Sequence, residues 1–183
     1  AIDIERPVLY NGLDLDFNRL TDRNFEILLY RIFKDSIDNG KFSGKFDQIM
    51  LMTGVRDRGQ DCALFYNQQQ IGLIQCKKYN GNLNKSLVIK EILKFVLYSI
   101  DDERLFSESK DGIFTYYFAA STGFSNEVNN YIGTFSSSIT TEPSLEKYVK
   151  ELINSYTSIS YLKYDEIESK LDSRLTKIDV KPI

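Results

Sequence analysis

Two short apolar runs joined by four polar residues constrain the fold of this chain more than any other feature of its sequence. The runs are residues 62–66 and 71–74, and their length and spacing predict a β-hairpin. The second run continues into Gln75-Cys76-Lys77. Because side chains alternate between the two faces of a strand, Gln75 and Lys77 are expected on one face and Cys76 on the other.

Asp61, which precedes the first run, can share the face of Gln75 and Lys77 in only one register. It must lie directly opposite Gln75, which requires antiparallel pairing centred on Gln68 and therefore a loop with an odd number of residues. A slip of one residue would turn Asp61 to the opposite face. In the required register a carboxylate, an amide oxygen and a lysine meet at a solvent-facing end of the sheet.

The segments around the hairpin show helical and extended patterns in turn. Thr21 has the side chain of an N-cap, and apolar residues recur at helical spacing after it through Ile37. Further patterns predict strands at 46–53 and 113–120 and helices at 85–100, 126–132, 142–156 and 165–175, and they allow a short strand at 159–162. Residues 176–183 are assigned no element.

This order of elements predicts an α/β protein with a mixed sheet flanked by helices. We expect residues 1–19 to form an N-terminal arm and residues 20–133 to form the core. Residues 134–183 are expected to form a mostly helical extension packed on that core.

Composition limits the chemistry that is open to the chain. The 183 residues include no histidine, which excludes Ser-His-Asp and Cys-His catalysis and every His-ligated metal within this chain. Cys62 and Cys76 cannot form a zinc site by themselves. The sequence begins without the features of a signal peptide and contains no apolar run long enough to cross a membrane. A cytoplasmic location without membrane attachment is therefore expected.

Charge is unevenly distributed along the chain. The formal net charge is −3, yet residues 41–100 carry nine basic and four acidic side chains. A locally positive region can attract a polyanion whatever the total charge of the protein. The alternative is that Lys85, Lys90 and Lys94 only solvate a helix face, which is the simpler explanation for any one of them.

The residues at the end of the hairpin suit a hard cation. Asp61 and the side-chain oxygen of Gln75 can hold one Mg²⁺ that keeps several waters, and the backbone carbonyl of Cys76 is a further oxygen nearby. Lys77 can then orient or deprotonate an attacking water, or stabilise the charge on a pentavalent phosphorus. Hydrolysis of a phosphodiester is the reaction that these groups predict. Glu26 lies beside the apolar stripe of the first helix, where a glutamate usually just faces water.

Three motifs occur in order along roughly residues 20–132. They are Phe25-Glu26-x-Leu28, then Asp57-Arg58-Gly59-Gln60-Asp61 with the hairpin and Gln75-Cys76-Lys77, and finally FAASTGFS at 118–125. Together they resemble the PD-(D/E)XK nuclease superfamily, and most closely its Mrr-like restriction endonuclease branch. The resemblance implies a restriction-endonuclease-like fold with a four-stranded mixed sheet between helices. It also implies Mg²⁺-dependent cleavage of DNA, with Mn²⁺ as a substitute.

The resemblance also implies roles for individual residues. The catalytic residues would be Asp61, Gln75, Lys77 and Glu26, and the metal ligands would be Asp61, Gln75, the backbone carbonyl of Cys76, and Glu26 through a water. Gln75 stands where the superfamily more often has an acid, which removes one negative charge from the metal site. DNA contacts would come from Arg56, Arg58, Lys78, Lys85, Ser121 and Thr122.

Simpler roles for some of these residues stay open. Arg56 and Arg58 can pair with Asp57 instead of a phosphate. The turn after the strand at 113–120 suits phosphate oxygens, but Ser125 can also be an N-cap and nothing more.

The expected partner is double-stranded DNA, cut by a homo-oligomer because two cuts on opposite strands are most simply made by a dimer. The expected context is the nuclease effector module of a restriction or anti-phage defence protein, with a fused NTPase or sensor domain. The alternative is a nuclease-like domain without catalysis that binds nucleic acid or serves assembly.

Overall fold

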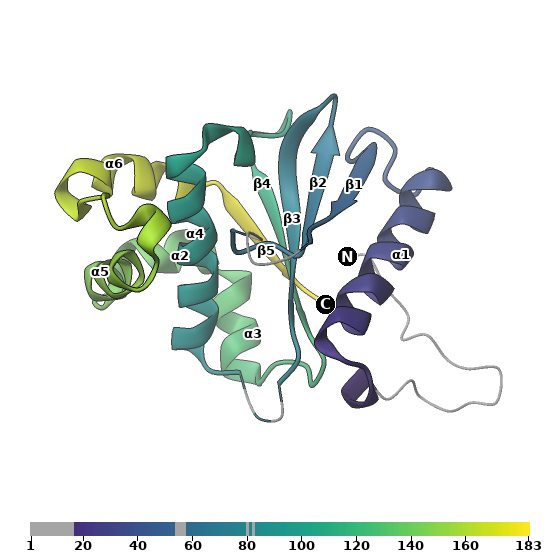
Figure 1. Cartoon of the computed structure of the whole chain (residues 1–183), viewed down its shortest axis with the longest axis horizontal. Coiled ribbons are helices and arrows are strands. Elements are labelled where there is room, and N and C mark those ends of the chain that lie inside the picture. Colours follow the sequence, from purple (N-terminus) through teal and green to yellow (C-terminus); the bar gives the residue numbers. More distant parts are fainter. Residues whose placement is uncertain (1–16, 54–57, 80, 82) are drawn as a thin grey trace.

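The protein is a mixed five-stranded sheet with helices on both faces (Figure 1). The computed structural model describes residues 17–53, 58–79, 81 and 83–183. The strands lie in the order β1-β2-β3-β4-β5, with bounds Gln48–Leu51, Cys62–Tyr66, Gln69–Lys77, Phe114–Ala120 and Ile178–Pro182. The pairs β1/β2 and β2/β3 are antiparallel, whereas β3/β4 and β4/β5 are parallel.

Helices form the outer layers of the molecule. They are α1 (Asp22–Asp38), α2 (Lys85–Asp101), α3 (Asn126–Gly133), α4 (Phe135–Ser138), α5 (Leu145–Ser155) and α6 (Tyr164–Leu175), with short 3₁₀ turns at Phe17–Arg19, Glu103–Leu105, Ile139–Thr141 and Thr157–Ile159. The predicted helix start at Thr21 is confirmed, because its side chain accepts a hydrogen bond from the backbone N–H of Asn24. Ser125 likewise caps α3 by accepting from Val128 N–H. In the described part of the chain no helix has the length and apolar character that crossing a membrane requires.

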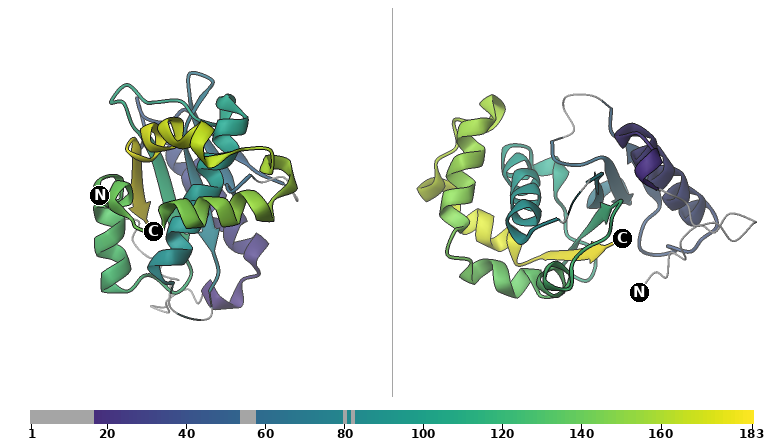
Figure 2. Two further views of the ribbon diagram at one scale, coloured as in Figure 1. Left: turned by 90° about the vertical axis from the view of Figure 1, so that its left-hand side faces the viewer. Right: turned by 90° about the horizontal axis from the view of Figure 1, so that it is seen from below.

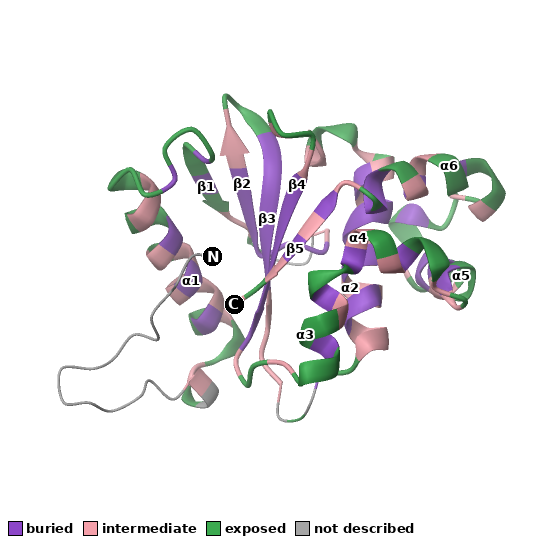
Figure 3. Ribbon diagram, turned by 180° about the vertical axis from the view of Figure 1, so that it is seen from behind, coloured by how far each residue is buried: buried purple, intermediate pink, exposed green. Residues whose placement is uncertain are grey.

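Two hydrophobic layers enclose the sheet. On one face α1 packs Phe25, Leu29 and Phe33 against a cluster that includes Ile74. On the other face α2, α5 and α6 share a larger cluster that includes Leu73, and Figure 2 shows α1 separated from these helices by the sheet. Strands β3 and β4 lie in the middle and are buried over most of their length (Figure 3). The fold therefore brings the end of β3 between α1 and α2.

The hairpin has the predicted register near Asp61 but reaches it by a different loop. The pairing Cys62↔Ile74 is centred on Gln68, as predicted. The loop, however, contains two residues, Asn67 and Gln68, with φ angles of 49° and 66°, as in the turns that suit two-residue hairpins. The prediction of an odd loop is wrong, because an irregularity between Leu64 and its neighbour Phe65 absorbs the extra residue.

The sheet has five strands where the sequence predicted four. Strand β5 comes from the C-terminal residues that were assigned no element, and it pairs in parallel with β4 from Phe114↔Ile178 onward. Five residues with alternating polarity carry a weak strand signal by themselves. Their ladder partner lies more than sixty residues away, so only packing reveals the strand. The short strand allowed at 159–162 is absent, since these described residues form the end of a 3₁₀ turn and the turn after it.

The predicted arm and extension differ in how far the structure describes them. Of the arm at 1–19, only residues 17–19 are described, and they form a 3₁₀ turn. Residues 134–183 supply α5 and α6, which contact α2, and β5, which contacts α3 and α4. The predicted boundary between 133 and 134 therefore falls before a strand of the central sheet.

Candidate active site

A pocket of about 340 Å³ lies where β3 leaves the sheet between α1 and α2. Its lining residues come from four parts of the chain: Asp22, Phe25 and Glu26 of α1, Asp61 before β2, residues Gln75 to Tyr79 at the end of β3, and Lys94 of α2. Asp61, Gln75, Lys77 and Glu26, for which catalytic roles were predicted, thus line one pocket. The pocket also contains the predicted backbone ligand Cys76 and the predicted DNA contact Lys78.

Asp61 is held in place by the backbone of β3. Its Oδ2 atom accepts a 2.6 Å hydrogen bond from the N–H of Cys76, and its own N–H donates to the carbonyl of Ile74 at 3.0 Å. Asp61 is 7% exposed, so the expectation of a solvent-facing position is wrong for this residue. Its carboxylate is therefore buried and fixed in position by the backbone of β3.

Gln75 has an amide group that is only partly satisfied. The residue is 4% exposed, and its Nε2 donates a long 3.5 Å hydrogen bond to the carbonyl of Cys76. Its Oε1 atom is buried and finds no hydrogen-bond partner among the described residues. Leaving a buried acceptor unpaired costs about 1–3 kcal/mol, and such a group calls for an explanation such as an ion or a water.

Lys77 forms an ion pair that the sequence did not predict. Its Nζ atom lies 3.0 Å from Oε1 of Glu91 on α2, and the two side chains are 29% and 19% exposed. Glu91 is the only acidic residue of α2 before Asp101, within a helix whose neighbouring residues are largely apolar. A single acid among apolar helix residues indicates that the acid has a specific partner. Helix periodicity alone, however, does not predict which strand residue that glutamate contacts.

Glu26 lines the pocket and is paired with an arginine of the same helix. Arg23 donates from Nη1 to Glu26 Oε2 at 2.7 Å and to the carbonyl of Met52 at 2.8 Å. Glu26 therefore does more than face water, since it pairs with the arginine that joins α1 to the segment after β1. Its carboxylate lies in the same pocket as Asp61, which makes two acidic groups there in addition to Asp22.

The two cysteines are poor metal ligands in this setting. Burial raises the pKa of the Cys62 thiol to about 12, and the charge of Asp61 adds to the effect. Burial also raises the pKa of Cys76 well above its usual value, again with a contribution from Asp61. Because only the thiolate is a good ligand, the ligands that this pocket offers at neutral pH are oxygens.

The predicted DNA contacts fall into separate places. Arg56 lies outside the described residues. Arg58 donates from Nη1 to Asp102 Oδ2 at 2.6 Å, at the far end of α2 from Glu91. Hydrogen bonds from Arg104 first, and from Arg58 as well, hold the pKa of the Asp102 carboxyl well below its usual range. Arg58 thus pairs with an acid, Asp102, whereas the predicted partner Asp57 lies outside the described residues.

The serine and threonine of the turn after β4 flank the end of β3. Ser121 accepts a 3.3 Å hydrogen bond from the N–H of Tyr79 through its Oγ atom, and its own N–H donates to the carbonyl of Lys77. Thr122 is exposed beside it. Ser121 therefore supports the segment that carries Lys77 and Lys78.

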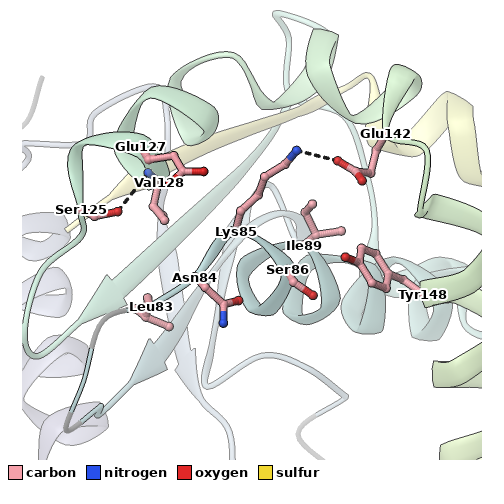
Figure 4. A pocket seen from close by; sticks show the side chains of 10 residues that line it. All are labelled: Leu83, Asn84, Lys85, Ser86, Ile89, Ser125, Glu127, Val128, Glu142 and Tyr148. Atoms are coloured by element: carbon pink, nitrogen blue, oxygen red, sulfur yellow. Dashed lines mark hydrogen bonds and ion pairs between the residues drawn. The ribbon is translucent and has the colours of Figure 1, made fainter.

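Lys85 lies in a second pocket of about 500 Å³ between the starts of α2, α3 and α5 (Figure 4). Its Nζ atom pairs with Glu142 Oε2 at 2.7 Å and lies 4.7 Å from the ring centre of Tyr131. Glu127 also lines this pocket. The charge of Lys85 is thus balanced by acids of its own pocket, and the residue is separate from the group around Asp61.

The three lysines of α2 share a role that the sequence did not predict, either as a region that attracts a polyanion or as a solvated helix face. Each ammonium group lies over a tyrosine ring from a later part of the chain: Lys85 over Tyr131, Lys90 over Tyr148 at 5.0 Å and Lys94 over Tyr156 at 5.1 Å. Cations over aromatic faces are attracted by the ring quadrupole. These lysines therefore help to hold the C-terminal helices against α2, and Lys94 also lines the pocket with Asp61.

The ligand set is sparse for a metal site. Among the described residues, no group of three or more cysteine, aspartate or glutamate side chains is arranged to hold a metal ion. Mg²⁺ nevertheless binds through one or two carboxylates while it keeps several waters, so Asp61 and the unpartnered oxygen of Gln75 fit it. No protein-family model, curated protein or solved structure matches this chain.

Proposed function

We propose that this protein is a Mg²⁺-dependent endonuclease that hydrolyses phosphodiester bonds of DNA. The observation that carries the proposal is the buried, unpartnered Oε1 of Gln75 in the same pocket as the anchored carboxylate of Asp61. Two fixed oxygens of this kind are suitable ligands for a hard cation. Without a cation, the unpartnered amide oxygen of Gln75 destabilises the fold, because a buried polar group without a hydrogen bond costs free energy.

Asp61 and Gln75 would hold the metal, with Glu26 acting through a water and the Cys76 carbonyl as a further oxygen. When bound, Mg²⁺ supplies charge stabilisation at the phosphate and lowers the pKa of a coordinated water. The hydrogen bond from Cys76 N–H keeps the Asp61 carboxylate from turning away.

Lys77 is the group best placed to act on the substrate itself. It lines the pocket on the same strand face as Gln75, so its ammonium can orient the attacking water or neutralise charge that develops on the phosphate. Lys78 and Lys94 add positive charge around the same pocket, which favours a polyanionic substrate.

The test is incubation of the purified protein with supercoiled plasmid and with a linear duplex, in Mg²⁺, Mn²⁺ or EDTA. Cleavage in either metal, absent in EDTA and absent in Asp61→Asn, is the expected result. Asp38→Asn is the matched control, because Asp38 is an exposed α1 residue that pairs with Lys34 away from the pocket. Failure of the wild type to cut under any divalent ion would refute the proposal.

A second candidate is a nuclease-like domain that binds nucleic acid without cutting it. The sparse ligand set and the pairing of Glu26 with Arg23 favour it, because both reduce the negative charge available to a metal. The same experiment separates the candidates when DNA binding is measured in parallel. Retained binding without cleavage supports the second candidate.

The same proposal includes three further points. The substrate is double-stranded DNA, and the active form is a homo-oligomer. The protein acts in restriction or anti-phage defence beside an NTPase or sensor domain. Cleavage of the linear duplex on both strands would support the first two. Sedimentation with and without duplex measures the assembly directly.

A further inference from the structure

The ion pair of Lys77 and Glu91 connects the last residue of β3 to the second turn of α2. The two side chains are more enclosed than those of Lys90 and Glu151, another pair on α2, which are 38% and 42% exposed. Lys77 lines the pocket, whereas Glu91 is not among the described residues that line it. Glu91 is thus linked to the pocket through its ion pair with Lys77.

Stability alone does not account for a glutamate at this place. In α2, Glu91 is flanked by Val88, Ile92 and Phe95, all fully buried. Its Oε1 contacts Lys77, but its Oε2 is buried and has no hydrogen-bond partner among the described residues. An ion pair with an unsatisfied oxygen contributes little to stability, and a pair of apolar residues in place of both members often stabilises a fold as well or better. The pair is better explained by what it does for Lys77.

We infer that Glu91 is a positioning residue for Lys77, an inference that rests on the proposed nuclease function. A lysine side chain has a long flexible stem and three ammonium donors. One donor held by Glu91 fixes the Nζ atom near the wall of the pocket and leaves the other two to point at water or phosphate. Fixing a reacting group in this way removes an entropic cost from the chemical step.

The kinetic test uses Glu91→Gln, which keeps the shape of the side chain and removes its charge. We expect kcat to fall about tenfold to one hundredfold, the loss seen when residues that orient the ligands of a metal site are replaced, with KM for DNA unchanged. Glu91→Asp should recover part of the loss. The matched control is Glu151→Gln, which breaks the Lys90 pair on the same helix and should leave kcat unchanged. A kcat of Glu91→Gln within about twofold of wild type would overturn the inference.

A second variant separates positioning from a purely structural role. Glu91→Met removes the unpartnered oxygen but leaves the half-buried ammonium of Lys77 without its ion-pair partner, so it should melt lower than wild type while cutting as slowly as Glu91→Gln. If Glu91 served only stability, both variants would melt lower and cut at the wild-type kcat.

A readout without metal or DNA keeps this inference distinct from the proposed function. Brief acetylation followed by mass spectrometry measures how accessible the Lys77 amine is, relative to the exposed Lys41. An amine held by a carboxylate reacts slowly, so Glu91→Gln should raise Lys77 acetylation several-fold, and Glu151→Gln should not. If Glu91→Gln leaves the acetylation of Lys77 unchanged, Glu91 does not position the Lys77 amine. A different outcome would refute only the nuclease proposal. In that outcome the wild type does not cut DNA, while Glu91→Gln still raises the acetylation of Lys77.

Discussion

Replacement of Gln75 by methionine should stabilise the protein while abolishing its activity. Gln75 is 4% exposed and its Oε1 has no partner among the described residues, so methionine removes an unpaired acceptor and adds buried apolar surface. Among the described residues, the hydrogen bond of this side chain is the 3.5 Å contact of Nε2 with the Cys76 carbonyl, which is too long to contribute much. Removing the unpaired oxygen should raise the free energy of unfolding by about 1–3 kcal/mol.

The assay is urea or thermal unfolding in EDTA, where no cation can satisfy Gln75. For a domain of this size each kcal/mol raises Tm by about 2–4 °C. Gln70→Met is the matched control, because Gln70 lies in the same strand, is 3% exposed and donates a 2.6 Å hydrogen bond to Gln60 Oε1. That variant loses a satisfied bond and should be destabilised.

Two results would refute this reasoning. If Gln75→Met unfolds earlier than wild type, the Gln75 oxygen is satisfied in solution and is no argument for a cation. If Gln75→Met still cuts DNA, the oxygen takes no part in the site. Added Mg²⁺ should also raise the Tm of the wild type by mass action and leave the Tm of Gln75→Met unchanged.

Three further predictions follow from contacts around the pocket and α2. Asp61→Ala should abolish cleavage and lower stability by about 1–3 kcal/mol, because it leaves a β3 backbone N–H unpaired; Asp61→Asn should abolish cleavage with little change in Tm, so equal melting of the two variants would contradict this. Hydrogen bonds led by those from Arg104 lower the pKa of Asp102, so Asp102 stabilises the fold above the pKa of an unfolded aspartate, about 4, and this contribution is lost as the pH falls below it. Between pH 7 and pH 3 the free energy of unfolding of Asp102→Asn should fall less steeply than that of wild type. An equal fall in the two proteins would contradict the stabilising role of the Asp102 carboxylate. Gly59→Ala should lower Tm, because φ is +77° and a Cβ would lie 3.0 Å from the Phe95 backbone nitrogen; a Tm equal to that of wild type would mean that the turn relaxes away from α2.

Local features of the chain predicted most of the secondary structure. Apolar periodicity and the N-cap at Thr21 predicted α1, and the hairpin pattern predicted the register in which Cys62 pairs with Ile74. These features depend on residues close in sequence, where backbone sterics, capping and the two-residue period of a strand act directly. The gathering of Asp61, Gln75 and Lys77 near one another follows from the same local rules, together with the resemblance.

Other features were decided only by the tertiary structure. Strand β5 forms because β4 offers a free edge to residues that carry a weak signal of their own. Lys77 meets Glu91, and the lysines of α2 meet tyrosines, because packing brings together segments that are distant in sequence. The burial of Asp61 and the unpartnered oxygen of Gln75 likewise depend on the helices that enclose the end of β3. The sequence by itself thus determined which groups stand near the site, whereas the tertiary packing decided how deeply they are buried and which partners they keep.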